Sequence, residues 1–143
     1  FGWAKPIPVV TRNFRDVRMG MRMVAIAGPM SNLIMAFGWA IVLALGVYVP
    51  ADYQTPLQTM AQYGIVINAV MFVLNMIPIL PLDGGRFVDT FLPAKTSMQF
   101  QKLEPYGTWV ILLLLVTGLL SKIMFPFVSL ITGLAYTLAK LLG

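Results

Sequence analysis

Long runs without a charged residue dominate the chain and predict helices that cross a membrane. Met23 to Val49 carries no charge and, at about 1.5 Å per residue, can cross a hydrocarbon core of about 30 Å. Gly64 to about Asn75 predicts a second helix, within a charge-free run from Thr55 to Leu82. Two shorter apolar runs, Tyr106 to Leu120 and Ile123 to Ala139, predict a tilted hairpin or two partly re-entrant helices. We therefore predict an all-α polytopic membrane helix bundle with two full-length transmembrane helices and two shorter apolar helices.

The other segments are basic, polar or rich in proline. Residues 1–22 are basic and include Pro6 and Pro8, so we expect a segment at the lipid headgroups or, as the alternative, a specific binding role for the prolines. Residues 23–143 then form a single membrane-embedded helical domain. The expected connections are a polar loop from Pro50 to Gln62, a short helix from Gly84 to Phe91, and an amphipathic or irregular stretch from Leu92 to Pro105.

The stretch Asn75 to Arg86 interrupts the second apolar run in a way that presents a carboxylate. Pro78 and Pro81 lack an N–H and push the preceding residues toward extended backbone, so a helix arriving at Asn75 should end there. Asp83 should then lie in a segment where the main chain is not helical. The two glycines after it allow another group to approach the main chain closely. A carboxylate at the edge of a membrane span is a functional candidate. The competing interpretation is that Asp83 caps the following helix.

The first long helix also carries a stripe of small and polar residues. These recur every four positions: Gly28, Asn32, Ala36, Ala40 and Ala44. Small stripes allow membrane helices to approach closely, so we expect this face to contact another helix. Pro29 should kink the helix. In the second helix, Asn68 and Asn75 should point into the bundle, either for a hydrogen bond between helices or beside a reactive centre.

The composition limits the chemistry available to these 143 residues. They are 59% hydrophobic and only 10% charged, whereas a soluble domain carries about a quarter charged residues. The net charge of +5 therefore indicates basic residues beside a membrane, and we expect no nucleic-acid partner. The chain contains no cysteine and no histidine, which removes disulfides, thiolate nucleophiles and the commonest metal ligand.

The basic residues predict how the chain lies in the membrane. If the helix from Met23 runs outward, nine of the ten basic residues stay inside and only Lys122 lies outside. The nine are Lys5, Arg12, Arg15, Arg18, Arg22, Arg86, Lys95, Lys102 and Lys140. The positive-inside rule then predicts a cytoplasmic amino terminus and an even number of crossings. It also places Gly28 to Asn32 and Asn75 to Asp83 at the same depth, in one intramembrane site open to the cytoplasm.

Two motifs resemble the site-2 protease family of intramembrane zinc metallopeptidases. Gly28-Pro29-Met30-Ser31-Asn32 is similar to the family's Gly-Pro-x-x-Asn helix. Asn75-x-x-Pro78-x-x-x-Leu82-Asp83-Gly84-Gly85 is similar to its Asn-x-x-Pro-x-x-x-Leu-Asp-Gly signature. The flanking Phe-Gly-Trp-Ala-Lys-Pro and Glu104-Pro105-Tyr106-Gly107 resemble small bacterial members that lack a PDZ domain.

The resemblance implies a role for each matching residue. Asp83 would be a zinc ligand, and the catalytic residues Asn75 and Asn32 would place substrate or stabilise charge near the scissile carbonyl. The residues implied to shape the site or bind substrate are Gly28, Pro29, Pro78, Gly84 and Gly85. Substrates would be transmembrane helices cleaved within the lipid bilayer, as in regulated intramembrane proteolysis by a hydrolase of the bacterial plasma membrane.

The family's His-Glu-x-x-His helix, which supplies two ligands and the general base, has no counterpart here. One aspartate cannot hold a catalytic zinc ion, so we expect the chain alone to be inactive. A start at Phe1 also indicates a fragment, the C-terminal part of a protease whose N-terminal catalytic helix is missing. Two alternatives remain. One is a non-catalytic scaffold or pseudoprotease that binds helices, and the other is a small transporter that uses Asn68, Asn75 and Asp83.

Overall fold

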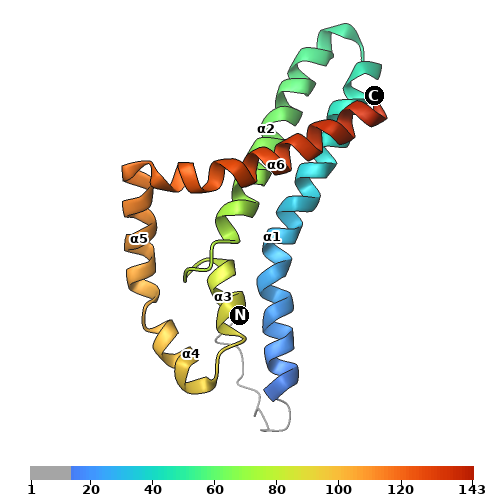
Figure 1. Cartoon of the computed structure of the whole chain (residues 1–143). Coiled ribbons are helices and arrows are strands. Elements are labelled where there is room, and N and C mark those ends of the chain that lie inside the picture. The colour runs from blue at the N-terminus through green and yellow to red at the C-terminus, as the bar shows by residue number, and fades with distance from the viewer. Residues whose placement is uncertain (1–13) are drawn as a thin grey trace.

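The computed structural model describes residues 14–143, with side chains described from Val17 onward, and this part of the chain is helical without a strand (Figure 1). The predictions for Pro6, Pro8 and Arg12 concern residues outside this range. The elements are α1 (Phe14–Leu45), the 3₁₀ turn η2 (Gly46–Tyr48), α2 (Ala51–Asn75), α3 (Asp83–Asp89), α4 (Ala94–Gln101), α5 (Glu104–Thr117) and α6 (Leu119–Leu142).

Three of these helices, α1, α2 and α6, are long and apolar enough to cross a membrane, whereas α5 is shorter. The protein is therefore an all-α integral membrane bundle, as the sequence predicted. Helix α6 is longer than expected because it begins at Leu119 and continues through Ser121 and Lys122 and past Pro126. Gly118 separates it from α5 with a φ of 79°, a left-handed conformation that glycine adopts without steric cost.

The prediction of a polar loop from Pro50 to Gln62 is wrong, because α2 already begins at Ala51. Pro50 stands just before the first helical residue, and the Gln54 side chain donates hydrogen bonds to the carbonyls of Val47 (3.2 Å) and Val49 (3.0 Å). These bonds close a tight turn between α1 and α2. Polar residues in the first turns of α2 therefore belong to a helix, and their polarity does not indicate a loop.

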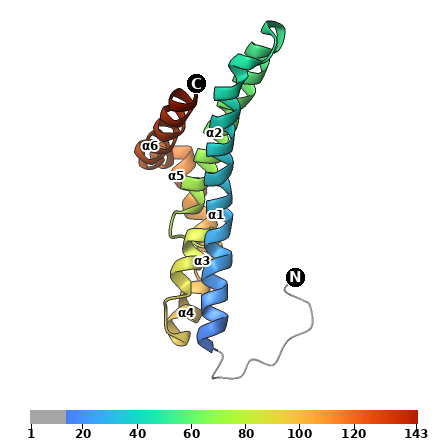
Figure 2. The same cartoon turned by 90° about the vertical axis from the view of Figure 1, so that its right-hand side faces the viewer.

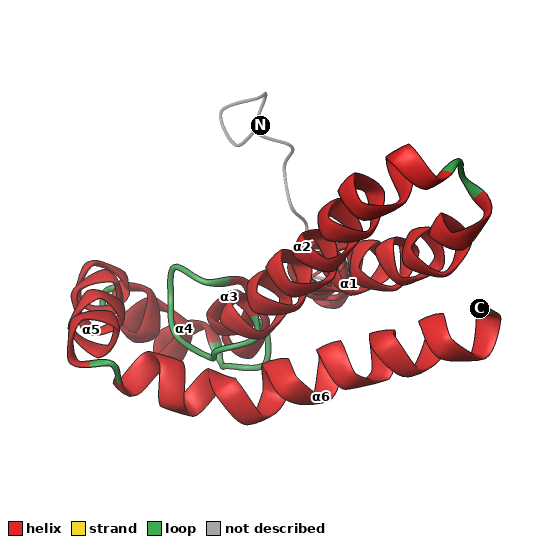
Figure 3. Ribbon diagram, turned by 90° about the horizontal axis from the view of Figure 1, so that it is seen from above, coloured by secondary structure: helices red, strands yellow, loops and turns green. Residues whose placement is uncertain are grey.

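The predicted stripe of small residues on α1 is buried between helices. Ala36 and Ala40 are fully buried and Ala44 is 5% exposed. Ala40 and Ala44 pack with Ile65 of α2 and with small residues of α6, among them Ala135. Helices α1 and α2 lie side by side as an antiparallel pair, and α6 crosses them obliquely (Figures 1 and 3). The prediction that this face contacts another helix is confirmed.

The chain ends beside the end of α1, which corrects the position expected for Lys140. A Cβ on Gly143 would lie 3.6 Å from the carbonyl oxygen of Ala44, far from the α1 residues that contact α3. Figure 2 shows the same arrangement, with the C-terminus away from α3 and α4. Lys140 therefore lies at the opposite end of α1 from Arg18 and Arg22. Helix α6 continues away from α5, so the last two apolar runs do not form a tilted hairpin, which was one of the two arrangements expected for them (Figure 1). The even number of crossings stays a prediction.

The segment between α2 and α3 is packed closely by glycines. A Cβ on Gly84 would lie 2.5 Å from the carbonyl oxygens of Met76 and Ile77, and one on Gly85 would lie 2.4 Å from the Leu80 nitrogen. The segment turns through a hydrogen bond from Leu82 N to Ile79 O of 2.8 Å, and the Leu80–Pro81 peptide is cis. The main chain thus folds back on the first turn of α3 and places α3 beside α1.

Candidate functional site

Asp83 lies where the two sequence motifs meet. It is the first residue of α3, and its carboxylate faces Gly28 of α1. A Cβ on Gly28 would lie 2.7 Å from Asp83 Oδ2, closer than side-chain atoms ordinarily approach. The absence of a side chain at position 28 therefore leaves the space that this carboxylate occupies. This contact agrees with the prediction that both motifs lie at the same depth.

Asp83 does not cap α3. The residue before the helix is Leu82, and no side-chain hydrogen bond caps this end. Within residues 17–143, the half-buried carboxylate of Asp83 makes no hydrogen bond or ion pair. The capping interpretation is therefore wrong, and the carboxylate oxygens are available to another partner.

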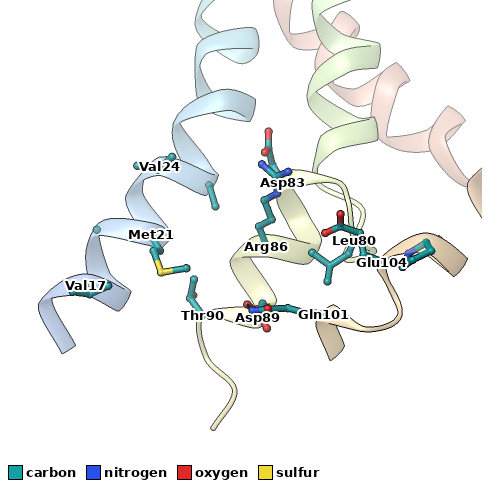
Figure 4. Close-up of a pocket in the computed structure, with 13 residues that line it drawn as sticks. Val17, Met21, Val24, Leu80, Asp83, Arg86, Asp89, Thr90, Gln101 and Glu104 are labelled. Carbon is teal, nitrogen blue, oxygen red and sulfur yellow. Dashed lines mark hydrogen bonds between the residues drawn. The ribbon is translucent and has the colours of Figure 1, made fainter. Parts of the chain in front are cut away.

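Two cavities meet at Asp83. The smaller, about 90 Å³, brings together Pro29, Pro78, Asp83 and Gly84, with apolar residues such as Ala25 around them. The larger is an open cavity of about 850 Å³ between the first turns of α1 and the group α3, α4 and the start of α5 (Figure 4). Its polar wall consists of Asp83, Arg86, Asp89, Thr90, Gln101 and Glu104. Asp83 therefore lines both a small apolar pocket and a wider cavity that has one polar wall.

The two asparagines implied by the resemblance stand near this point without contacting Asp83. Asn32 is half-buried one turn beyond Gly28, and its Nδ2 lies 3.4 Å from the Gly28 carbonyl of its own helix. Asn75 is the last residue of α2 and is also half-buried. No hydrogen bond links Asn32, Asn75 and Asp83 in the part of the chain with described side chains. Gly85 packs on the main chain of the segment before α3 and does not line either cavity.

Sequence reasoning missed a buried polar cluster at the other end of α3. Asp89 is 6% exposed, and its two carboxylate oxygens accept hydrogen bonds from Ser97 Oγ (2.6 Å) and Gln101 Nε2 (2.9 Å). Both donors belong to α4, so the cluster joins α3 to α4. One signal was present in the sequence. An aspartate in the last turn of a helix opposes the helix dipole, and such a position indicates a compensating partner.

Two arginines of α1 also bind this end of α3, which the sequence did not predict. Arg18 Nη1 donates to the carbonyls of Asp89 (3.1 Å), Thr90 (2.7 Å) and Leu92. Arg22 donates to the Thr90 hydroxyl (3.1 Å) and carbonyl (3.2 Å), and its guanidinium lies 3.9 Å from the centroid of a phenylalanine ring in the same segment. At least these two basic residues contact protein, although the segment was expected at lipid headgroups.

The described residues around Asp83 supply one ligand for a metal ion, which is Asp83 itself. Asp83 offers an anionic oxygen without a protein partner, which suits a divalent cation. No group of three histidine, cysteine, aspartate or glutamate side chains comes together within the described residues. A tetrahedral zinc ion needs three protein ligands in a catalytic site, so these residues supply part of a site.

Comparison with models of known protein families gives a match for this chain. Residues 47–118, which run from η2 to the end of α5 and include Asp83, match the model of peptidase family M50. The chain belongs to this family, the site-2 protease family. M50 membership agrees with the zinc-metalloprotease resemblance of the two motifs.

A curated relative adds to the match. The chain is 38% identical over 133 residues, 90% of its own length, to "Putative zinc metalloprotease YwhC" of Bacillus subtilis strain 168. It spans 61% of the length of that relative. No solved structure matches the chain significantly. The chain therefore matches part of the longer relative.

Proposed function

We propose that this M50 chain forms the C-terminal part of an intramembrane protease that cleaves transmembrane helices, with Asp83 as one zinc ligand. The observation that carries the proposal is the contact between Gly28 and Asp83. Gly28 and Asp83 belong to two separate motifs and lie 55 positions apart in the sequence, and they meet at a carboxylate that no group within residues 17–143 binds. That carboxylate lies against α1, which is one of three helices long enough to cross a membrane. An unpaired carboxylate in such surroundings is costly, and a metal ion would compensate for it.

Zinc, when bound, supplies a nucleophile from water at neutral pH and polarises a carbonyl. The residues of this chain do the rest of what we propose. Gly28 leaves room for the Asp83 carboxylate, and the packed segment before α3 fixes the main chain that carries it. The apolar residues around the small cavity, such as Ala25 and Pro29, keep bulk water from one side of the carboxylate. The remaining ligands and the general base would come from a His-Glu-x-x-His segment outside these 143 residues.

Asn32 and Asn75 are proposed to act on the substrate. Both are half-buried, and each carries an amide that can hydrogen-bond a peptide group. Asn75 ends α2 where the main chain breaks, so its amide stands at the edge of the span. Since neither amide contacts Asp83, their proposed task is to bind the main chain of the substrate near the scissile bond and to stabilise charge there.

We propose that the site opens to the cytoplasm in a bacterial plasma membrane. Arg18, Arg22, Lys95 and Lys102 belong to the first turns of α1 and to the α4 region, which lie at the same end of the molecule (Figure 1). Basic residues favour the cytoplasmic side. Cysteines placed at Lys95 and at Gln54 should react with a membrane-impermeant reagent from opposite sides. Reaction of both from the same side would contradict this orientation.

The test of the ligand assignment is Asp83→Asn in the protein extended upstream to include a His-Glu-x-x-His segment. Asparagine keeps the size of the side chain and removes its anionic oxygen, so bound zinc and cleavage of a model transmembrane substrate should both collapse while the fold survives. Asp52→Asn, on an exposed aspartate in the first turn of α2, removes the same charge elsewhere and is the control. Normal zinc content and normal cleavage in Asp83→Asn would refute the ligand role.

The same experiment tests the competing scaffold function. The competing function is that of a pseudoprotease, which binds transmembrane helices without cleaving them. If the extended wild-type protein binds a transmembrane helix but neither zinc nor cleavage is detected, the scaffold function is the correct one.

A further inference from the structure

Helix α3 is attached to α1 at both of its ends. At the first end Asp83 lies against Gly28, and at the other end Arg22 binds Thr90. The two helices run in opposite directions along this contact, because the residue number rises on α1 as it falls on α3. Six residues separate Arg22 from Gly28, and seven separate Asp83 from Thr90, which corresponds to about 9 and 10 Å of helix. The two attachments are therefore in register.

The packing between these attachments does not by itself fix the direction of α3. A helix of seven residues has little stability of its own. Between the attachments, side chains of α1 such as Ala25 and Pro29 and of α3 such as Val88 surround a cavity of about 90 Å³, so the packing there is incomplete. Gly84 and Gly85 hold the first turn of α3 on the segment before it. That end can act as a pivot, so the contacts at the far end determine the angle of α3 and hence where Asp83 points.

The contacts at the far end suit this task chemically. The last carbonyls of a helix have no partner within the helix, and cations near them also complement the helix dipole. Arg18 and Arg22 donate to the carbonyls of Asp89, Thr90 and Leu92 through planar guanidinium groups that present several N–H bonds in fixed directions. A lysine ammonium cannot reproduce that set of directions.

We propose that Arg18 and Arg22 are positioning residues that hold Asp83 against Gly28 by binding the carbonyls at the opposite end of α3. The importance of this for catalysis rests on the proposed function of Asp83. We call these contacts of Arg18 and Arg22 with the end of α3 the clamp, and its effect on the angle of α3 does not depend on a metal ion. The buried cluster of Asp89 with Ser97 and Gln101 reinforces it by joining the same end of α3 to α4.

The geometric arm of the test measures a distance without any metal ion. Since the chain has no cysteine, nitroxide labels can be placed on cysteines at Ile34 of α1, which is 67% exposed, and at Arg86 of α3, also exposed. Pulsed electron spin resonance should give one narrow distance distribution in the otherwise unchanged chain. The double change Arg18→Ala and Arg22→Ala should broaden it, and Arg22→Lys should give an intermediate width.

Two controls separate positioning from charge and from general stability. Lys95→Ala removes an exposed positive charge at the same end of the molecule and should leave the distribution narrow. Ala40→Leu destabilises the protein at the contact of α1 with α2 and α6, and it should also leave the distribution of the folded fraction unchanged. A double-alanine protein that folds and keeps the narrow distribution would overturn the clamp.

The second arm measures zinc affinity in the extended protein. Arg22→Lys should weaken zinc binding about 10- to 100-fold, the loss typical of residues that orient a metal ligand. Substrate KM should change little, because the arginines are not proposed to touch substrate. Unchanged zinc affinity in a protein with a broadened distance would refute the link to Asp83. If the extended wild type binds no zinc, the proposed function fails, and the distance measurement still decides the clamp.

Discussion

The two halves of α1 make contacts of different kinds with the rest of the protein. From Gly28 onward, small side chains such as Ala36 and Ala40 allow α2 and α6 to approach, and the packing is apolar. Before Gly28, the helix binds α3 through arginine donors and carbonyl acceptors. The half from Gly28 onward depends on the shape and small size of its side chains. The half before Gly28 depends on hydrogen bonds with defined directions, and it holds the far end of α3, the helix that begins with Asp83.

The difference teaches where precision is required. A helix pair packed by alanines can shift slightly without breaking a specific bond. Asp83, by contrast, is held by a main chain that folds onto Gly84 and Gly85 and by arginines at the far end of α3. A residue that serves as a metal ligand must be held within a fraction of an ångström. The region with the more exacting contacts is therefore the one proposed for chemistry.

The largest effect is expected where two stretches of main chain touch. Gly107→Ala puts a Cβ 1.8 Å from the carbonyl oxygen of Leu80, and a main chain within a packed turn cannot move aside cheaply. We expect a loss of about 3 kcal/mol or more in the free energy of unfolding. Gly133→Ala on α6, where nothing lies within 4 Å, is the control and should gain up to about 1 kcal/mol. Similar stabilities for the two variants in detergent unfolding would show that the segment before α3 is not tightly packed.

An intermediate loss of stability is expected for a substitution in the apolar half of α1, from Gly28 onward. Ala40→Leu adds three carbons to a fully buried position between α1, α2 and α6, with an overpacking cost of about 1 to 3 kcal/mol. Gly38→Leu adds a larger group to the same helix at an exposed position where nothing lies within 4 Å, and it should leave the yield of folded protein unchanged. Equal losses from both changes, or no loss from either, would argue against a specific contact.

The halves of α1 also differ in how far the sequence predicts them. The stripe at every fourth residue predicts the apolar contact because residues four apart lie on the same helix face, and small side chains there allow close approach. Counting charges and span lengths predicted that the motifs of Gly28 and Asp83 lie at the same depth, whereas the contact between the two residues is known only from the structure. The arginine contacts with α3 could not be predicted, because their acceptors are main-chain carbonyls, which every residue has. The buried role of Asp89 depends on how α4 folds back, and that is a tertiary property.

The smallest effect on folding is expected for a substitution at Gly28. Gly28 and Gly107 both lie close to a neighbour, but the neighbours differ in how easily they can move. Gly28→Ala also introduces a Cβ too close to its neighbour, 2.7 Å from Asp83 Oδ2, but this neighbour is the tip of a side chain. The carboxylate can rotate away, and alanine is the better helix former by about 1 kcal/mol. We therefore expect a change of less than about 1 kcal/mol in the free energy of unfolding. Zinc affinity of the extended protein should nevertheless fall, because the carboxylate no longer occupies its place.

Gly20→Ala is the matched control for this prediction, since it lies on the same helix with nothing within 4 Å. Gly20→Ala should change the free energy of unfolding by less than about 1 kcal/mol. It should leave the zinc affinity of the extended protein unchanged. A Gly28→Ala protein that loses several kcal/mol would mean that Asp83 is held too rigidly to rotate. One that keeps full zinc affinity would mean that the observed place of the carboxylate is not the place from which it binds metal. The expected pattern, an intact fold with weakened metal binding, arises only if the space left by Gly28 exists for the carboxylate and not for the packing of α1.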